Sequence, residues 1–205
     1  MITISLYEPT IGYGSNTYLL NSDNSYAVVD PSISFEDFSR RTYIPSGALK
    51  YVILTHGHFD HIMEIDSWVK ATGASVLVGE ADRFMLRDPA QNCYSLFLGT
   101  SDGYFGEVKA LSDGDVIRLG EDDIEVISLP GHTPGCIALV FDENMVVGDT
   151  VFASGYGRYD LPGGDLESLR YSIKRVLSYP DHFKVFPGHG PSSDIKSIKR
   201  YLYFD

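Results

Sequence analysis

The sequence predicts an α/β or α+β protein in which layers of helix cover β-sheets. Nine short runs rich in apolar and β-branched residues occur across both halves of the chain, and most are bounded by Gly, Pro, Asn or Asp. Five segments with helical features lie between or after these runs. Strands in both halves with helices between them require helix layers over the sheets.

The expected strands are short, and each ends in turn-forming residues. They are TISLY (3–7), TYLLN (17–21), YAVVD (26–30), YVILT (51–55), SVLVG (75–79), IEVISL (124–129), IALVF (137–141), MVVGD (145–149) and KVFPG (184–188). The expected helices are 35–41, 61–71, 80–87, 165–178 and 194–203. Asp165 and Asp194 are expected N-caps, because a carboxylate can accept from the free N–H groups of a first turn. Two irregular stretches, 88–106 and 150–164, are expected to be loops over a site.

Composition limits the function. At 205 residues the chain is expected to form one domain, 1–205. A net charge of −12 opposes nucleic-acid binding, which needs clustered Lys and Arg. No run approaches a membrane span and the N-terminus lacks a signal-peptide pattern, so we expect a soluble cytoplasmic protein. Cys93 and Cys136 form no CxxC unit and are expected to be reduced thiols.

Five of the six histidines stand where a predicted strand ends. The segment THGHFDHI (55–62) follows the apolar run YVIL and holds three histidines and an aspartate. Three later strands are followed by His132, Asp149 and His189. Side chains at the ends of neighbouring strands converge, and imidazole with carboxylate suits zinc and other first-row metals. His182 has no ligand spacing around it and is expected to be an ordinary hydrogen-bonded residue.

Seven candidate ligands are enough for two metal ions. His56 and His58 face the same way in extended backbone, whereas the step to His61 fits a chain that turns into a helix after residue 60. Three exclusive ligands for each ion and one shared carboxylate account for all seven groups. We expect two divalent ions, zinc in the first place, with iron or manganese as alternatives.

The combined pattern resembles the metallo-β-lactamase superfamily, and specifically its glyoxalase II-like (hydroxyacylglutathione hydrolase-like) branch. Four segments carry the resemblance: THGHFDH (55–61), GHTPG (131–135), GDT (148–150) and PGHG (187–190). It implies a four-layer αββα sandwich with the metals in a groove at one edge. It also implies that His56, His58 and His132 hold one ion, that Asp60, His61 and His189 hold the other, and that Asp149 bridges them.

Smaller features bear on the subfamily. Asp149 in GDT looks like the hydrolase branch, because some true β-lactamases have a cysteine there. GRYDLPGGD (157–165) resembles short bacterial glyoxalase II-like proteins. DPAQNC (88–93) resembles a family loop near the groove, which usually has Ser where Cys93 stands.

Two departures from the family bear on the site and the substrate. Met63 and Glu64 replace two glycines that are common in the family, so different backbone packing is expected beside the metals. The chain ends at Asp205, soon after PGHG, without the helical segment that helps eukaryotic-type enzymes bind glutathione. This argues against a glutathione thioester as the natural substrate.

The expected activity is hydrolysis of a small acyl thioester, such as S-lactoylglutathione, by a metal-bridging hydroxide. Metal coordination lowers the pKa of water to about 7, and a thiolate leaving group needs little help from a general acid. Asp60 is expected to bind metal and to orient the hydroxide. Tyr156, Arg158 and Tyr159 are candidates for substrate contacts, with ordinary loop packing as the competing interpretation.

Three alternatives stay open. An iron-dependent persulfide dioxygenase-like oxygenase would use His56, His132 and Asp149, but the complete second set opposes it. A lactonase or an RNA-processing nuclease has the same fold; Phe152 stands where lactonase relatives tend to have Tyr, and the acidic charge opposes RNA. A non-catalytic metal-binding module is the third, and the intact ligand set argues against it.

Overall fold

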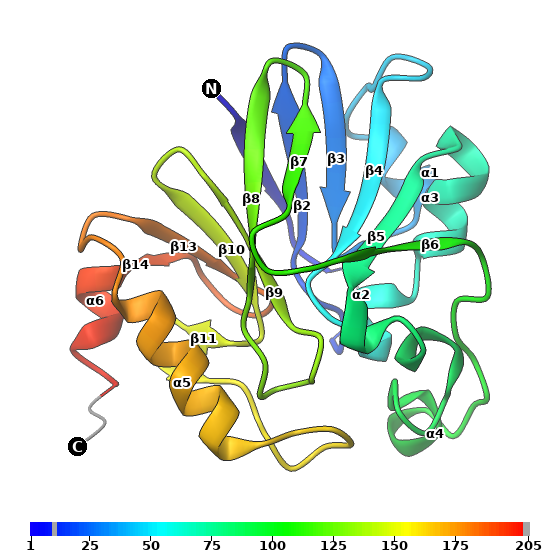
Figure 1. Cartoon of the computed structure of the whole chain (residues 1–205). Helices are drawn as coiled ribbons and strands as arrows, with labels where there is room; N and C mark the ends of the chain where they lie inside the picture. Colours follow the sequence, from blue (N-terminus) through cyan, green and yellow to red (C-terminus); the bar gives the residue numbers. More distant parts are fainter. Residues whose placement is uncertain (10–11, 203–205) are drawn as a thin grey trace.

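The structure is a computed structural model that describes residues 1–9 and 12–202. Its strands form two six-stranded sheets and a two-stranded ribbon (Figure 1). The first sheet has the order β1 (Thr3–Tyr7), β2 (Thr17–Ser22), β3 (Ser25–Val29), β4 (Leu49–Leu54), β5 (Ser75–Gly79) and β6 (Val108–Leu111). Strands β1 to β3 are antiparallel to one another, and β3 to β6 are parallel.

The second sheet is mostly antiparallel. Its order is β14 (Ser193–Asp194), β13 (Lys184–Pro187), β10 (Asn144–Gly148), β9 (Ile137–Phe141), β8 (Asp122–Ser128) and β7 (Val116–Leu119). Only β10 and β13 run parallel within it. The ribbon consists of β11 (Val151–Phe152) and β12 (Gly155–Tyr156).

The helices are short, with one exception. They are α1 (Phe35–Ser39), α2 (Phe59–Ile62), α3 (Ile65–Thr72), α4 (Tyr94–Phe97), α5 (Leu166–Leu177) and α6 (Ile195–Lys199). Two 3-10 turns, Glu80–Asp82 and Met85–Arg87, follow β5. None of the helices in the described part of the chain is long and apolar enough to cross a membrane.

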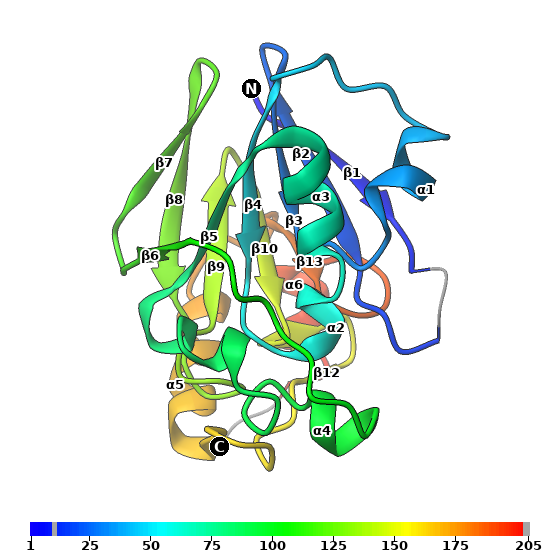
Figure 2. The ribbon, with the colours of Figure 1, turned by 90° about the vertical axis from the view of Figure 1, so that its right-hand side faces the viewer.

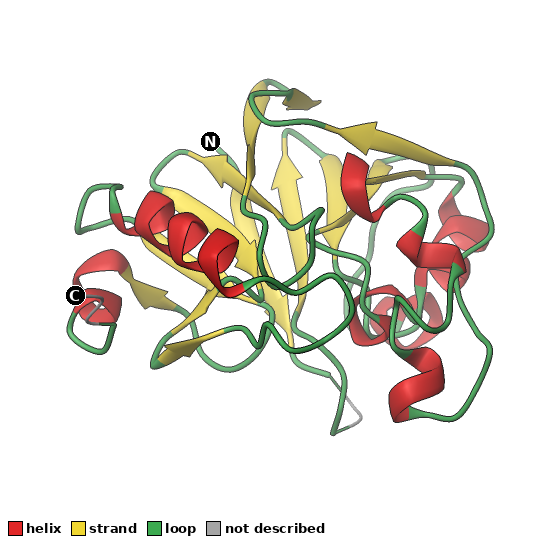
Figure 3. Cartoon of the chain, turned by 60° about the horizontal axis from the view of Figure 1, so that its bottom comes forward, coloured by secondary structure: helices red, strands yellow, loops and turns green. Residues whose placement is uncertain are grey.

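Three hydrophobic clusters define four layers, which confirms the predicted αββα sandwich. The first lies between the first sheet and α1 and α3, where Phe38 packs against Trp68 at a ring-centroid distance of 4.7 Å. Figure 2 looks onto this helix-covered face. The second cluster fills the space between the two sheets. The third lies under α5 and α6, on the opposite outer side (Figure 3).

The period of two along the strands explains why the sheets bury both faces. In β9, Ile137 and Leu139 belong to the cluster between the sheets, whereas Ala138 and Val140 face the α5 side. In β4, Ile53 faces the other sheet while its neighbours in the strand face α3. Continuous apolar runs such as IALVF are therefore what this sandwich requires.

Helix α5 shows how the outer layer forms. Leu169, Ile173 and Val176 recur at helical spacing and are completely buried. As predicted, the carboxylate of Asp165 caps the helix by accepting from the backbone N–H of Ser168 at 2.8 Å. Asp194 caps α6 in the same way, and that helix ends at Lys199 rather than at residue 203; residues 203–205 lie outside the described part of the chain.

Some expected elements were wrong in extent or kind. The helix expected over 61–71 is two helices, α2 and α3, and the one expected over 80–87 is the pair of 3-10 turns. The strand predicted over 124–129 is β8, but its hairpin partner β7, which alternates polar and apolar residues, was not predicted. The short helix α4 lies inside the stretch expected to be a loop over 88–106.

Met63 and Glu64 form the junction between α2 and α3. Their φ values of −61° and −111° are open to any residue, so the corner needs no glycine. The backbone N–H of Glu64 donates to the carbonyl of Pro31 at 3.2 Å, and Met63 packs against the first hydrophobic cluster. Met63 is therefore accommodated by packing on the core, and Glu64 by a backbone conformation and a backbone hydrogen bond that do not depend on glycine.

Candidate metal centre

The ends of four strands deliver all seven predicted ligands to one edge of the sandwich. His56 and His58 follow β4, and α2 starts so early that Asp60 and His61 lie in its first turn. The loop after β8 holds His132, and the other two strands that contribute are β10 and β13. Asp149 follows β10 directly, and His189 follows β13.

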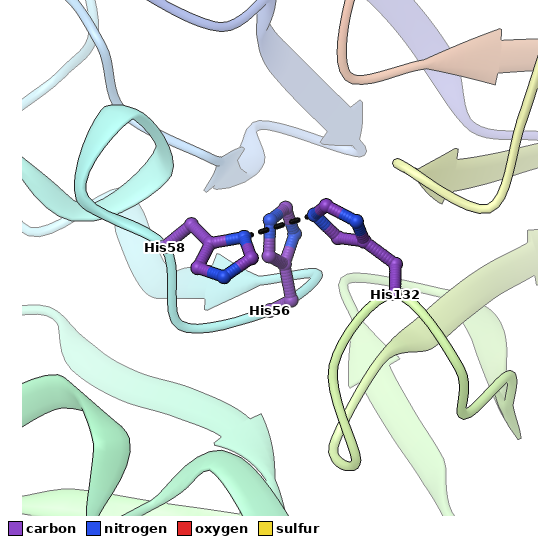
Figure 4. A group of neighbouring side chains, drawn as sticks. All are labelled: His56, His58 and His132. Carbon is purple, nitrogen blue, oxygen red and sulfur yellow. Dashed lines mark hydrogen bonds between the residues drawn. The ribbon is translucent and has the colours of Figure 1, made fainter. Parts of the chain in front are cut away.

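The structure brings these seven side chains together. Three groups have their nitrogen and oxygen ligand atoms within 4.8 Å of one another: His56 with His58 and His132; His56 with His61 and Asp149; and Asp60 with His61 and His189. Figure 4 shows His56 and His58 on one side of the first group and His132 facing them from the other. His56 and Asp149 each lie next to members of both predicted ligand sets, so two ion positions would be adjacent.

The cluster contains buried polar atoms without a hydrogen-bond partner. Among the described residues these include the Nε2 atoms of His56, His58 and His61, together with Oδ1 of Asp149. Leaving such atoms buried and unpaired is costly, and native proteins rarely do so. Imidazole nitrogens and a carboxylate oxygen that converge in this way are ligand atoms that a cation can pair. The residues present therefore suit a metal ion.

Asp60 and Asp149 place carboxylates among the imidazoles. His189 Nε2 lies 3.0 Å from Asp60 Oδ2 and 3.6 Å from Asp149 Oδ2. His61 Nε2 lies 3.6 Å from an oxygen of each carboxylate. On the other side, His132 Nε2 is 3.7 Å from Asp149 Oδ2. Asp149 is thus the carboxylate that touches both halves of the cluster.

Gly188 leaves the space that Asp149 occupies. A Cβ atom at this position would overlap the Asp149 carboxylate and lie 2.6 Å from Cε1 of His61. Position 188 therefore has to be a glycine if the side chains of Asp149 and His61 are to stay where they are.

The outer nitrogen of several imidazoles is held by the protein. His61 Nδ1 lies 2.8 Å from Asp30 Oδ2, and His132 Nδ1 lies 2.7 Å from the carbonyl oxygen of Arg158. Thr55 Oγ1 is 3.2 Å from His56 Nδ1. Contacts of this kind fix the ring orientation and leave the other nitrogen for a metal.

Asp30 and Asp82 are functional residues that sequence reasoning missed. Asp30 is buried at φ 50° and accepts from the backbone N–H and the hydroxyl of Thr55, at 2.8 and 2.7 Å, besides contacting His61. It ends the apolar run YAVVD, and an acidic residue in that position was the available signal.

Asp82 connects the two loops that carry the first ligand group. Its buried carboxylate accepts from the backbone N–H of Gly57 at 2.9 Å, from the Thr133 hydroxyl at 2.6 Å and from the backbone N–H of Gly135 at 2.7 Å. Gly57 lies between His56 and His58, while the other two donors follow His132 within three residues. Nothing in the sequence around Asp82 points to this role.

The cluster shifts the pKa values of its members in opposite directions. Burial, with the neighbouring histidines, lowers the pKa of His56 well below its ordinary value and that of His58 to about 3. Burial also opposes the charged form of His61, but the carboxylates of Asp30, Asp60 and Asp149 outweigh it and raise the His61 pKa to about 10. For Asp60, burial is outweighed by His61 and His189, which lower the pKa to about 2.

A cleft of about 520 Å³ opens onto the cluster. Its walls are largely aromatic; Tyr13, Phe59, Phe97, Phe152 and Tyr156 line it, together with Cys93, Arg158, Leu161 and five of the predicted ligands. Of the three predicted substrate-contact residues, Tyr156 and Arg158 line the cleft, whereas Tyr159 is not among the lining residues. Cys93 and Cys136 are free and buried, in agreement with expectation.

His182 lies apart from the cluster. Its side chain is 58% exposed and contacts Glu143 at 3.3 Å, on the surface near the start of β13. This agrees with the expectation that the sixth histidine has no part in the site.

Comparison with known proteins places this geometry in a family. The family model described as "Metallo-beta-lactamase superfamily" matches residues 10–189. The hydroxyacylglutathione hydrolase GloC of Haemophilus influenzae is 29% identical, over 94% of this chain and 93% of that protein. The solved structure of the B3 metallo-β-lactamase BLEG-1 superposes with a TM-score of 0.86 at 28% identity, covering 95% of each chain.

A second solved structure bears on the metal. TTHA1623 in a di-iron-bound form has a TM-score of 0.81 at 29% identity, with 95% of this chain and 96% of that chain covered. Fold, sequence and the arrangement of the histidine and aspartate side chains thus agree. The chain belongs to the metallo-β-lactamase superfamily.

Proposed function

We propose that this protein is a binuclear metal-dependent hydrolase that acts on a small acyl thioester. The observation that carries the proposal is the convergence of seven histidine and aspartate side chains, four of which bury an unpaired ligand atom. Members of the superfamily are metal-dependent hydrolases, and the open cleft above the cluster gives a substrate access to it.

The proposed ligand sets follow the groups that the fold brings together. His56, His58 and His132 hold one ion, while Asp60, His61 and His189 hold the other. Asp149 lies between the sets and is the proposed bridge. Zinc, iron and manganese all suit imidazole with carboxylate, and a di-iron form of the related TTHA1623 supports iron as well as zinc.

Bound divalent metals would supply Lewis acidity, which lowers the pKa of water and polarises a substrate carbonyl. The chain's own residues hold this site in place. Asp30 orients His61, the carbonyl of Arg158 orients His132, and Asp82 joins their loops. Asp60 keeps a carboxylate beside His189, where it can accept a hydrogen bond from a water molecule in the cleft. The aromatic walls exclude bulk water from the bound acyl group.

A thioester is the favoured substrate class for two reasons. The curated relative GloC is a hydroxyacylglutathione hydrolase, which cleaves this kind of bond. A thiolate with a pKa of about 8.5 also leaves without strong protonation, so the reaction depends little on a general acid. The likeness to BLEG-1 makes a β-lactam amide the competing substrate.

The test combines metal analysis with four substrate assays. Purified protein is analysed for Zn, Fe and Mn, then assayed with S-lactoylglutathione, a cephalosporin, a lactone and glutathione persulfide with an oxygen electrode. We expect two metals per chain and thioester turnover. A single iron with oxygen uptake would overturn the proposal, as would hydrolysis of the cephalosporin alone. The variant His182→Ala removes a histidine outside the cluster and serves as the matched control.

A further inference from the structure

Exposed aromatic rings form one wall of the cleft. Phe97 stacks on Phe59 at a centroid distance of 5.4 Å and an interplanar angle of 26°, and Tyr13 lies 6.0 Å from Phe59. Phe97 and Tyr13 are 47% and 49% exposed, although they stand beside a buried metal-ligand cluster. A substrate that covers these rings removes apolar surface from water, which favours binding of an apolar group.

The cleft has little positive charge to offer a substrate. Among the described residues that line it, Arg158 is the only lysine or arginine. Its guanidinium is already bound by Asp160 through two contacts, Nε to Oδ1 at 2.8 Å and Nη2 to Oδ2 at 2.9 Å. It also lies 5.8 Å from the ring centroid of Phe97. The Nε–Nη2 edge of the guanidinium, one of the edges that can form a fork with a carboxylate, is therefore in use.

Glutathione fits this cleft poorly. It carries two carboxylates, whereas Arg158 is the only lysine or arginine among the described lining residues and already has one edge bound to Asp160, so at least one carboxylate would stay unpaired. Asp160 has the advantage because it is tethered two residues away, which gives it a high effective concentration. The chain's net charge of −12 also disfavours the approach of an anion.

We infer that the enzyme selects acyl thioesters whose thiol half is uncharged and whose body is apolar, and that Asp160 sets this preference by occupying Arg158. The inference rests on the proposed thioester hydrolysis. The charges of the cleft thus favour a neutral thiol over glutathione as the leaving group of the substrate.

The closing experiment uses four thioesters and the metal-loaded full chain. Acetyl and phenylacetyl groups are each joined to glutathione and to the neutral thiol N-acetylcysteamine. For either acyl group, we expect kcat/KM to be about tenfold higher with the neutral thiol. Phenylacetyl should exceed acetyl on the same thiol. Added salt should narrow the gap between the two thiols, since it screens repulsion of the anion.

Two pairs of variants test the residues. Asp160→Asn frees Arg158 and should raise kcat/KM for both glutathione thioesters by about threefold to fivefold, with no change for the neutral ones. Its control, Asp123→Asn, breaks the similar exposed pair with Arg118 on the β7–β8 hairpin. Phe97→Ala should reduce the preference for phenylacetyl, whereas Phe105→Ala, at an exposed ring that does not line the cleft, should not.

The outcomes separate the two proposals. Equal or faster hydrolysis of the glutathione thioesters by the parent protein would overturn the inference and leave thioester hydrolysis standing. An Asp160→Asn variant that changes neither thiol's kcat/KM would overturn the role of Asp160. Metal-loaded protein that cleaves none of the four would overturn the proposed function, and the inference with it.

Discussion

The ligand cluster and the rim of the cleft lie side by side but are built in opposite ways. His56, just after β4, and His61, in α2, are completely buried, and Thr55 and Asp30 contact their Nδ1 atoms. At the rim, Phe97 ends the one-turn helix α4 and Arg158 lies in a loop; both are about half exposed, and Arg158 contacts a neighbour two residues away. The cluster depends on the whole sandwich, whereas the rim depends on local loops.

This difference separates chemistry from selectivity. A change in the cluster disturbs side chains from both sheets, so the fold restricts what can replace them. A change at the rim alters what the cleft binds and leaves the strands beneath it in place. Substitutions in the two regions should therefore differ in metal content and stability as well as in rate.

The largest effect is expected for removal of a cluster histidine. His132→Ala takes away one candidate ligand and leaves Asp149 and His58 without their neighbour. We expect loss of one metal per chain and a fall in kcat of at least about a thousandfold. Metal analysis with thioester assays measures both. Full metal content in His132→Ala, equal to that of the His182→Ala control, would remove His132 from the ligand set.

A residue behind the cluster should have an intermediate effect. Asp82→Asn keeps the shape but replaces one oxygen by an NH₂ group, which cannot accept from Gly57, Thr133 or Gly135. Outer-shell changes of this kind cost about 10-fold to 100-fold in metal affinity or activity. The visible spectrum of the Co²⁺-loaded protein should change as well, since the ligand loops shift.

The control for this variant is Asp142→Asn. Asp142 also accepts a backbone N–H, that of Ile2 at 3.0 Å, but it lies outside the cluster. It should leave the Co²⁺ spectrum as in the parent protein. If Asp82→Asn and Asp142→Asn lower the melting temperature alike and both keep the parent spectrum, Asp82 has only a structural role.

Metal binding should release a proton. In the metal-free protein the pKa of His61 is about 10, raised from 6.5, so His61 is protonated at pH 7 and an ion has to displace that proton. One displaced proton makes the apparent affinity fall about tenfold per pH unit as pH is lowered. Calorimetry in buffers of different ionisation enthalpy counts the protons, and a count of zero would contradict the assignment.

The same pKa shift predicts how the metal-free fold responds to pH. Because the folded-state pKa of His61 is raised, its stabilising contribution is complete below pH 6.5 and is lost as pH rises toward 10. The melting temperature of the metal-free protein should therefore decline over this window. The variant His61→Asn should decline less.

The smallest effect is expected at the rim. Phe97→Ala removes an exposed ring from the cleft wall, so its metal content and melting temperature should match the parent's, and its rate on acetyl thioesters should change by less than about threefold. If Phe97→Ala lost much of its metal, the rim would not be independent of the ligand cluster, and the comparison drawn above would be wrong.

The sequence was informative where one residue and its near neighbours decide the outcome. Apolar runs predicted the strands that are buried on both faces, and histidine spacing predicted the cluster. Helix 61–71 was wrong because its break at Met63 and Glu64 depends on a backbone contact to Pro31.

Partners far apart in the sequence explain what was missed at the site. The role of Asp82 depends on its hydrogen bond with Thr133, 51 positions away, and that of Asp30 on its contact with His61, 31 positions away. The aromatic wall likewise depends on Phe59 and Phe97 meeting across a loop. Composition gave no sign of the pairing between Arg158 and Asp160.

The connection that Asp82 makes between the loops after β4 and β8 has a consequence for folding. The cluster draws on residues from 56 to 189, and it is complete only after the two sheets have docked. Contacts of such long sequence separation form late. An ion that binds only the docked state lowers the free energy of that state and leaves the free energy of the unfolded chain unchanged. Chains that lose their metal should then unfold more often and be degraded sooner, so that inactive molecules are also the short-lived ones.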